Sequence, residues 1–128
     1  MADLAIANVA VALNTAVAIP ATTVATEDGI STAQNMVITP TKADAKILIR
    51  ATVADTNGAV GLSVTAGDFW ASTSALSLSV AQATTAIFIV EGGKYTQSDG
   101  TIVITATPAT GKKLKTDHAL TMSAFQLP

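Results

Sequence analysis

The sequence predicts an all-β protein, a single-domain antiparallel β-sandwich of jelly-roll or immunoglobulin-like type with an extended N-terminal arm. Three observations predict this class: short segments of alternating apolar and polar residues, turn signals about every 8–12 residues, and no convincing helical pattern. A chain of 128 residues has the size of one domain and can bury a hydrophobic core. We divide it into an N-terminal arm or edge strands at residues 1–35 and a β-sandwich domain at residues 36–128.

The strongest local pattern lies between Lys46 and Gly67. Alternate residues are apolar over 47–53 and again over 60–66, and this period of two is typical of half-buried strands. Asn57-Gly58 lies between the two segments, and both residues tolerate the positive φ of a tight turn. The pattern therefore predicts a central β-hairpin.

The first 35 residues carry weaker signals. Residues 4–19 are apolar and rich in alanine, but they lack the basic start of a signal peptide. The segment is also shorter than the roughly 20 residues that a membrane span needs, so we expect neither export nor membrane anchoring. Pro20 and the β-branched residues 22–24 disfavour a long helix. We therefore predict one or two extended strands here.

The remaining strands follow at short intervals. They are predicted at residues 36–39, 76–80, 85–90, 94–97, 101–107 and 118–127. The continuous apolar run of residues 85–90 is typical of a strand that is buried on both faces. Ser98-Asp99-Gly100 predicts a second hairpin turn.

Composition limits the classes of function. Charged residues make up 12% of the chain, about half the usual share near 25%, while Ala (25) and Thr (20) supply 45 of the 128 residues. A surface with so few charges is either covered in part by another protein or hydrated through Thr and Ser hydroxyl groups. The net charge of −2 gives no basic excess for nucleic-acid binding. The chain has no cysteine, which excludes disulfides and thiolate metal sites and favours synthesis in the cytosol.

The sequence predicts no catalytic residue, no cofactor and no metal ligand. His118 is the single histidine, and it follows Asp117 on a predicted strand, where the two side chains would point to opposite faces. The chain has no Gly-x-Ser-x-Gly nucleophile motif. We interpret His118 as a surface residue at the start of a strand, and the scattered acidic residues as solvated turn residues.

Two groups of residues could contact a partner. Phe69 and Trp70 lie in a predicted loop and form either an exposed anchor or a plug at one end of the core. Lys112, Lys113 and Lys115 form the one basic cluster of the chain, which either binds an acidic partner surface or is a solvated loop.

From Asn35 onward the order of elements resembles a known protein family. Residues 47–68, ILIRATVADTNGAVGLSVTAGD, combine an Ile/Val strand, an Asn-containing turn and a Val-Thr strand that ends in Ala-Gly-Asp. Residues 76–105, LSLSVAQATTAIFIVEGGKYTQSDGTIVIT, continue with an Ala-Thr-Thr turn, an apolar strand and the Lys-Tyr-x-Gln-Ser-Asp-Gly-Thr segment. This string resembles the small β-sandwich decoration proteins, also called auxiliary or head-stabilising proteins, of tailed bacteriophage capsids.

The resemblance implies a structural virion protein that binds the outside of an assembled phage capsid and stabilises it without catalysis. It implies the major capsid protein as partner, self-association as a trimer or binding as monomers around a capsomer, and no nucleic acid or membrane. Synthesis would take place in the host cytoplasm. The resemblance transfers no binding residue to a particular position of this chain.

Two alternatives stay open at this point. One is another virion component, such as a head-fibre base or a tail or baseplate module, in which residues 1–35 exchange strands between protomers. The other is a carbohydrate-binding or adhesion β-sandwich that uses Phe69, Trp70 and Tyr95 as stacking platforms, although aromatic residues make up only 4% of the chain.

Overall fold

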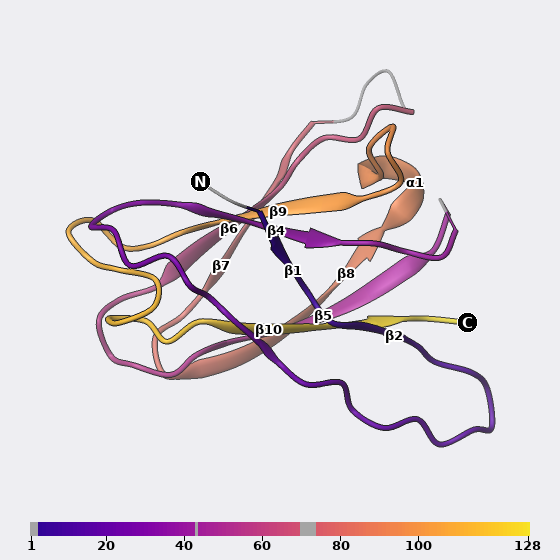
Figure 1. Ribbon diagram of the computed structural model, residues 1–128, viewed down its shortest axis with the longest axis horizontal. Coiled ribbons are helices and arrows are strands. Elements are labelled where there is room, and N and C mark those ends of the chain that lie inside the picture. The colour runs from indigo at the N-terminus through magenta and orange to yellow at the C-terminus, as the bar shows by residue number, and fades with distance from the viewer. Residues whose placement is uncertain (1–2, 43, 70–73) are drawn as a thin grey trace.

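Two β-sheets pack face to face in the computed structural model, which describes residues 3–42, 44–69 and 74–128 (Figure 1). The first, named the β9 sheet after its central strand, has the strand order β1 (Leu4–Ala5), β4 (Gln34–Ile38), β9 (Ile102–Thr107), β6 (Val60–Val64), β7 (Leu76–Val80). The second, the β5 sheet, has the order β2 (Asn8–Ala10), β10 (Thr121–Gln126), β5 (Lys46–Val53), β8 (Thr84–Glu91), and β3 (Thr23–Val24) pairs with the start of β10. The predicted all-β sandwich is confirmed.

The sheets are mixed, because two short strands near the N-terminus pair in parallel. β1 runs parallel to β4, and β2 runs parallel to β10, whereas the other ladders are antiparallel. The structure does not show the extended N-terminal arm that the sequence analysis predicts. The described residues before β4 instead add edge strands to both sheets, joined by a largely exposed loop at residues 12–22.

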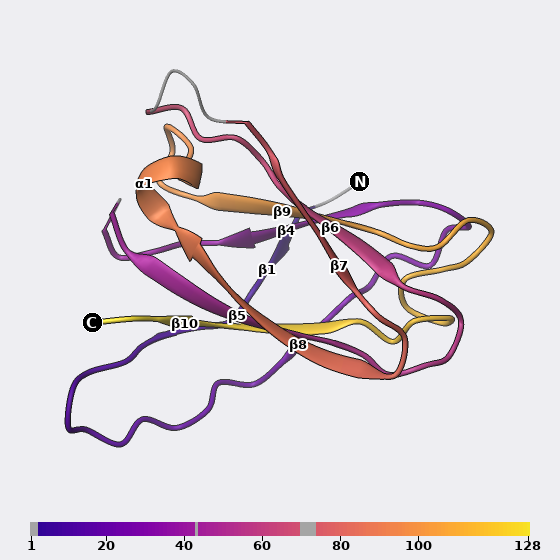
Figure 2. The ribbon, with the colours of Figure 1, turned by 180° about the vertical axis from the view of Figure 1, so that it is seen from behind.

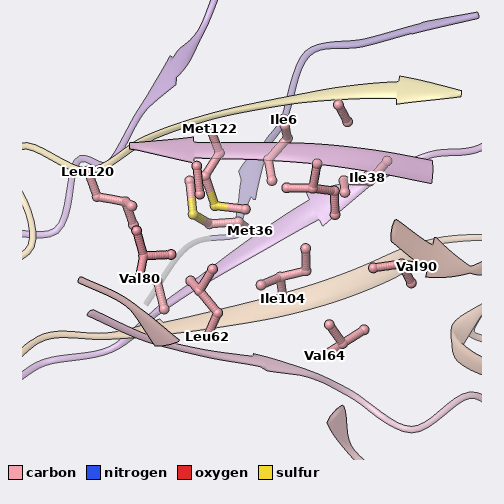
Figure 3. Packing of buried hydrophobic residues seen from close by; sticks show 14 of the residues in the cluster. Ile6, Met36, Ile38, Leu62, Val64, Val80, Val90, Ile104, Leu120 and Met122 are labelled. Atoms are coloured by element: carbon pink, nitrogen blue, oxygen red, sulfur yellow. The ribbon is translucent and has the colours of Figure 1, made fainter. Parts of the chain in front are cut away.

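The core forms between the inward faces of the two sheets. In β5 every second side chain from Ile47 to Val53 is fully buried, as the alternating pattern predicts. Figure 3 shows how side chains from the two sheets meet in this space, with Met122 of β10 beside Met36 of β4 and Ile104 of β9 near Leu62 of β6. Each of these large side chains contributes about 1.5–3 kcal/mol by leaving water, so this packing fixes how the sheets lie on each other.

The predicted central hairpin is wrong, since β5 and β6 belong to different sheets. The connection between them is a corner that crosses from one sheet to the other. Asn57 Nδ2 donates to the carbonyl oxygen of Asp117 at 2.7 Å, and the N–H of Gly58, at φ +106°, donates to Oε1 of Gln82 at 3.0 Å. Of the two predicted turn residues only Gly58 has a positive φ, and residues 55–57 form a bend and not a tight turn. Alternation could not show this, because it is the same for strands that pair side by side and for strands that face each other across a core.

The strand predicted at residues 94–97 is a single helical turn, α1 (Gly92–Tyr95). The N–H of Thr96 donates to the carbonyl oxygen of Gly92 at 2.9 Å and closes this turn. The tight turn predicted at residues 98–100 is present, because Gln97 N–H donates to Thr101 O at 2.7 Å and Gly100 has φ +86°. It joins the segment after α1 to β9 and so does not form a two-stranded hairpin.

Residues 85–90 form a strand as predicted, but the prediction that both faces of this strand are buried is wrong. It forms most of β8, which is the last strand of the β5 sheet. Figures 1 and 2 show it joined by a short turn to β7, the last strand of the other sheet. Ile87 and Ile89 are 65% and 53% exposed. An apolar run with no alternation therefore marks here a strand with one face in the core and the other on the surface.

Candidate interaction surface

β8 exposes both an apolar face and an unpaired backbone edge. Its inward side chains Ala86 and Phe88 pack against the core, and the next inward residue, Val90, is fully buried. The outward positions hold Ile87 and Ile89. Among the described strands only β5 pairs with β8. The opposite edge of β8 therefore has no partner strand in the described part of the chain.

The apolar character of this edge continues across the outward face of the β5 sheet. The register places four apolar residues of four neighbouring strands in one line, which we name the apolar row: Val9 of β2, Phe125 of β10, Leu48 of β5, Ile89 of β8. Val9, Phe125 and Leu48 are half-buried and Ile89 is exposed. Cross-strand neighbours of this kind form a continuous surface, and continuous apolar surfaces mark sites of interaction.

Charged side chains lie next to the apolar row. Lys46 and Arg50 occupy the outward positions of β5 on either side of Leu48, and Glu91 lies opposite Lys46 at the end of β8. Glu91 also lies 3.9 Å from the amino group of Lys94 in α1, and both side chains are about half exposed. Such an exposed pair adds little stability. The row itself contains no charged residue, but it has charged neighbours at Leu48 and near Ile89.

The residues predicted to contact a partner do not come together. Phe69 is 61% exposed in the loop between β6 and β7, and Trp70 lies outside the described residues. The loop is attached near the start of β9, because Asp68 N–H donates to Thr96 O at 3.2 Å. The three lysines follow the far end of β9, so they lie at the opposite end of the sandwich. Tyr95, the third aromatic residue of the proposed stacking platform, packs partly buried against the core.

The lysine loop is attached to acidic residues of its own chain. Lys115 N–H donates to the carbonyl oxygen of Glu27 at 3.0 Å, and the hydroxyl and N–H of Thr116 donate to Asp28 Oδ1. These hydrogen bonds from Thr116, with the nearby charges of Lys113 and Lys115, lower the pKa of Asp28. Part of the positive potential of the cluster is therefore balanced locally, which weakens it as a site for an acidic partner.

His118 is buried, so its interpretation as a surface residue is wrong. Its side chain is 0% exposed, and the backbone N–H of Ala109 donates to its Nε2 at 3.1 Å. Nε2 is therefore the unprotonated nitrogen, and Nδ1 carries the proton, with no hydrogen-bond partner among the described residues. Burial lowers the pKa of His118 and outweighs the opposite effect of Asp117. The residue holds the loop after β9 by accepting this backbone hydrogen bond.

The buried neutral His118 predicts a loss of stability in mild acid. Its folded-state pKa lies below the ordinary value of 6.5, so the unfolded chain binds the proton more tightly. The free energy of unfolding should therefore be constant above about pH 7 and fall as the pH drops below 6.5, until the folded-state pKa is passed. Urea titrations at pH 8, 7, 6 and 5 measure this directly.

The control is the His118→Gln variant, whose Oε1 can accept the Ala109 N–H but cannot be protonated. This variant should be less stable than the parent at pH 8. Between pH 7 and 5 its free energy of unfolding should fall much less than that of the parent. The lowered pKa values of Asp28 and Asp99 act at more acidic pH, below their ordinary value of 3.8. An equal decline in both proteins would show that His118 is not its source.

No group of three or more His, Cys, Asp or Glu side chains among the described residues is arranged to hold a metal ion. The one helix in the described ranges, α1, has four residues, so no described helix is long enough to cross a membrane.

The comparisons with known proteins found no matching family model, no matching curated protein and no matching solved structure. The surface described here therefore has to be interpreted from its own geometry. Sequence reasoning did not single out four apolar residues of this outward face: Leu48, Ile87, Ile89, Phe125. The apolar identity of these positions was visible in the sequence, but which of them lie side by side depends on strand order, which no residue pattern encodes.

Proposed function

We propose that the protein is a structural virion protein that binds the outside of an assembled phage capsid and stabilises it without catalysis. The observation that supports this most is the apolar row on the outward face of the β5 sheet, where Ile89 and the neighbouring Ile87 are exposed. A folded domain rarely leaves such a face in water unless another protein covers it. The resemblance of residues 47–68 and 76–105 to capsid decoration proteins supplies the identity of that partner, the major capsid protein.

The shape of the molecule suits this role. The two packed sheets hold the outward face of the β5 sheet as a fixed surface, so little conformational entropy is lost when it binds. The row is flanked by Lys46 and Arg50 on one strand and ends near Glu91, which gives a polar margin around an apolar centre. Protein–protein interfaces have this arrangement.

Stabilisation follows from differential binding. If the outward face of the β5 sheet contacts neighbouring capsid subunits at once, the complete binding site exists only on the assembled shell. A ligand that binds the assembled state and not the separated subunits stabilises assembly by RT ln(1 + [L]/Kd), which is about 2.7 kcal/mol for each site at a free concentration of 100 Kd. No chemical step is needed for this effect.

The test is sedimentation with empty heads of the same phage, purified from a strain that lacks this protein. We expect saturable binding at a fixed ratio to capsomers, a higher temperature of head disruption, and no binding to unassembled capsid subunits. Binding to subunits and heads with equal affinity would contradict the proposed mechanism, because such binding cannot favour the shell.

Two other outcomes would select the alternatives. Absence of head binding together with a stable ring in solution would favour a tail, baseplate or fibre component. Absence of head binding together with retention on a glycan array would favour the carbohydrate-binding module. Phe69→Ala is the matched variant for that array, since Phe69 is an exposed aromatic residue.

A further inference from the structure

We propose that two copies of this chain associate through β8, whose free edge pairs antiparallel with the β8 of the second copy about a twofold axis. The two β5 sheets would then form one continuous sheet. This interface is a property of the isolated chain, and it does not depend on the proposed binding to a capsid.

The backbone geometry of β8 leaves N–H and C=O groups at its open edge free to pair with another strand. Gly92 N–H, directly after β8, donates to the carbonyl oxygen of Ala45 at 2.7 Å and so points toward β5. The N–H and C=O groups of successive residues point to opposite sides of a strand. The alternation from Gly92 therefore directs both backbone groups of Thr85, Ile87 and Ile89 toward the open edge. The N–H of Glu91 points the same way, while its carbonyl, at the N-cap of α1, accepts the first hydrogen bond of that helix.

A side-chain contact supports this assignment. The hydroxyl oxygens of Thr52 and Thr85 lie 2.9 Å apart across β5 and β8. Directly opposite side chains come closest in pairs that do not exchange backbone hydrogen bonds, which is the kind of pair the alternation gives for these two residues. The backbone groups of Thr85 thus point away from β5.

The strand lacks the features by which soluble proteins protect a free edge. Charged residues, proline, a bulge or very short length normally prevent edge-to-edge pairing. β8 is eight residues long, has no proline, pairs with β5 in unbroken register and carries its single charge at the last position, Glu91. Both of its faces are apolar in the middle. A soluble chain that keeps such an edge is expected to cover it with another strand.

A second copy is the occupant that this edge fits by symmetry. One register gives each of the four outward residues a partner: the twofold axis passes through Phe88, Ile87 lies opposite the partner's Ile89, and Thr85 lies opposite the partner's Glu91. A shift of two residues in either direction leaves either Thr85 or Glu91 opposite no outward residue of the partner's β8. The register is self-complementary, as a twofold interface requires.

The charges agree with this register. Because Glu91 is the only ionised residue of β8, no like charges face each other when it lies opposite Thr85 of the second copy. On the outward face Ile87 of each copy would lie opposite Ile89 of the other, so the four isoleucines would form one apolar cluster across the interface. The exposed area of these isoleucines, 65% and 53%, is thereby reduced in both copies.

The first experiment compares Ile87→Lys with Ile30→Lys by sedimentation equilibrium of the purified chain. The two isoleucines are equally exposed, at 65%, but Ile30 lies in the turn before β4 and not on β8. We expect the parent and Ile30→Lys to sediment as dimers, with twice the chain mass of 12.9 kDa. For Ile87→Lys we expect a dimer dissociation constant at least 100-fold higher than that of the parent. Circular dichroism and urea titration check that both variants fold.

The results that would overturn the proposal are a monomeric or trimeric parent, or a dimer that Ile87→Lys leaves intact. A parent that is monomeric alone but dimerises only on heads would also overturn it, because the interface is proposed for the isolated chain. Retention of head binding by monomeric Ile87→Lys would leave the proposed function standing, so the two proposals fail separately.

The second experiment tests the register. The chain has no cysteine, so introduced thiols have no native competitor. We expect an interchain disulfide when Thr85→Cys protein is mixed with Glu91→Cys protein, because these positions lie opposite each other in the proposed pairing. Neither protein alone should cross-link, since two Thr85 positions would lie six residues apart, about 20 Å along the strands. Cross-linking of each protein with itself would contradict the register.

Discussion

The Leu48→Lys substitution is expected to weaken binding to empty heads by about 100-fold without unfolding the protein. Leu48 lies in the apolar row between Phe125 and Ile89, and its outward neighbours along β5 are Lys46 and Arg50. A third cation at this place would have to be buried against the shell without a partner, which costs several kcal/mol, and each 1.4 kcal/mol corresponds to a factor of ten. Sedimentation with heads over a range of protein concentrations measures the change.

Ser77→Lys is the matched control. Ser77 is exposed on the outward face of β7, in the other sheet, so this variant adds the same charge to a strand on the far side of the molecule. Its binding to heads should stay within about threefold of the parent. If Ser77→Lys lost binding and Leu48→Lys kept it, the β9 sheet would be the face that contacts the shell, and the apolar row would need another explanation.

The comparison of sequence and structure separates what residue patterns encode from what they do not. Alternation from Ile47 to Val53 identified which side chains of β5 are buried, because a period of two is a local property of a half-buried strand. The partner of that strand is a long-range property. β5 pairs with β8 and β10, which lie far from it in the sequence, and the turn at Asn57-Gly58 leads to the opposite sheet.

β8 shows why the candidate surface could not be predicted. A continuous apolar run is consistent with a strand covered on both faces and equally with an edge strand whose outer face is covered by a second chain. Ile87 and Ile89 are chemically indistinguishable from the core residue Ile49, and only their place on the outward face of the last strand of the sheet exposes them. Pairing of β8 with a second copy would cover part of this exposed apolar surface, which is what the continuous apolar run predicts.

His118 was misplaced for a related reason. A single histidine next to an aspartate on a predicted strand is typical of the surface. Its burial depends on the loop after β9 folding back so that the N–H of Ala109 meets Nε2. This contact lies between residues nine positions apart in an irregular segment, where neither the helical nor the strand period applies.

The largest expected effect on stability is at Gly67. A Cβ atom at this position would lie 2.4 Å from the carbonyl oxygen of Lys94 and 3.0 Å from that of Thr96, both of which are backbone atoms. The Gly67→Ala variant must therefore move the segment around α1 or lose the Gly67 N–H to Lys94 O hydrogen bond of 3.0 Å. Crowding of this kind costs about 1–3 kcal/mol and a lost hydrogen bond about 1 kcal/mol. We expect a loss of about 3 kcal/mol in the free energy of unfolding.

Gly61→Ala provides the contrast, since its Cβ would meet Thr107 at 3.9–4.0 Å, an ordinary van der Waals distance. Gly61 lies within β6, where alanine restricts the unfolded chain more than glycine does, so this variant should be as stable as the parent or more stable by about 0.5–1 kcal/mol. Urea titration of the three proteins decides the matter. Equal stability of Gly67→Ala and Gly61→Ala would mean that the segment around α1 shifts freely, and the loop bearing Phe69 would then not be held in place by the backbone of Lys94.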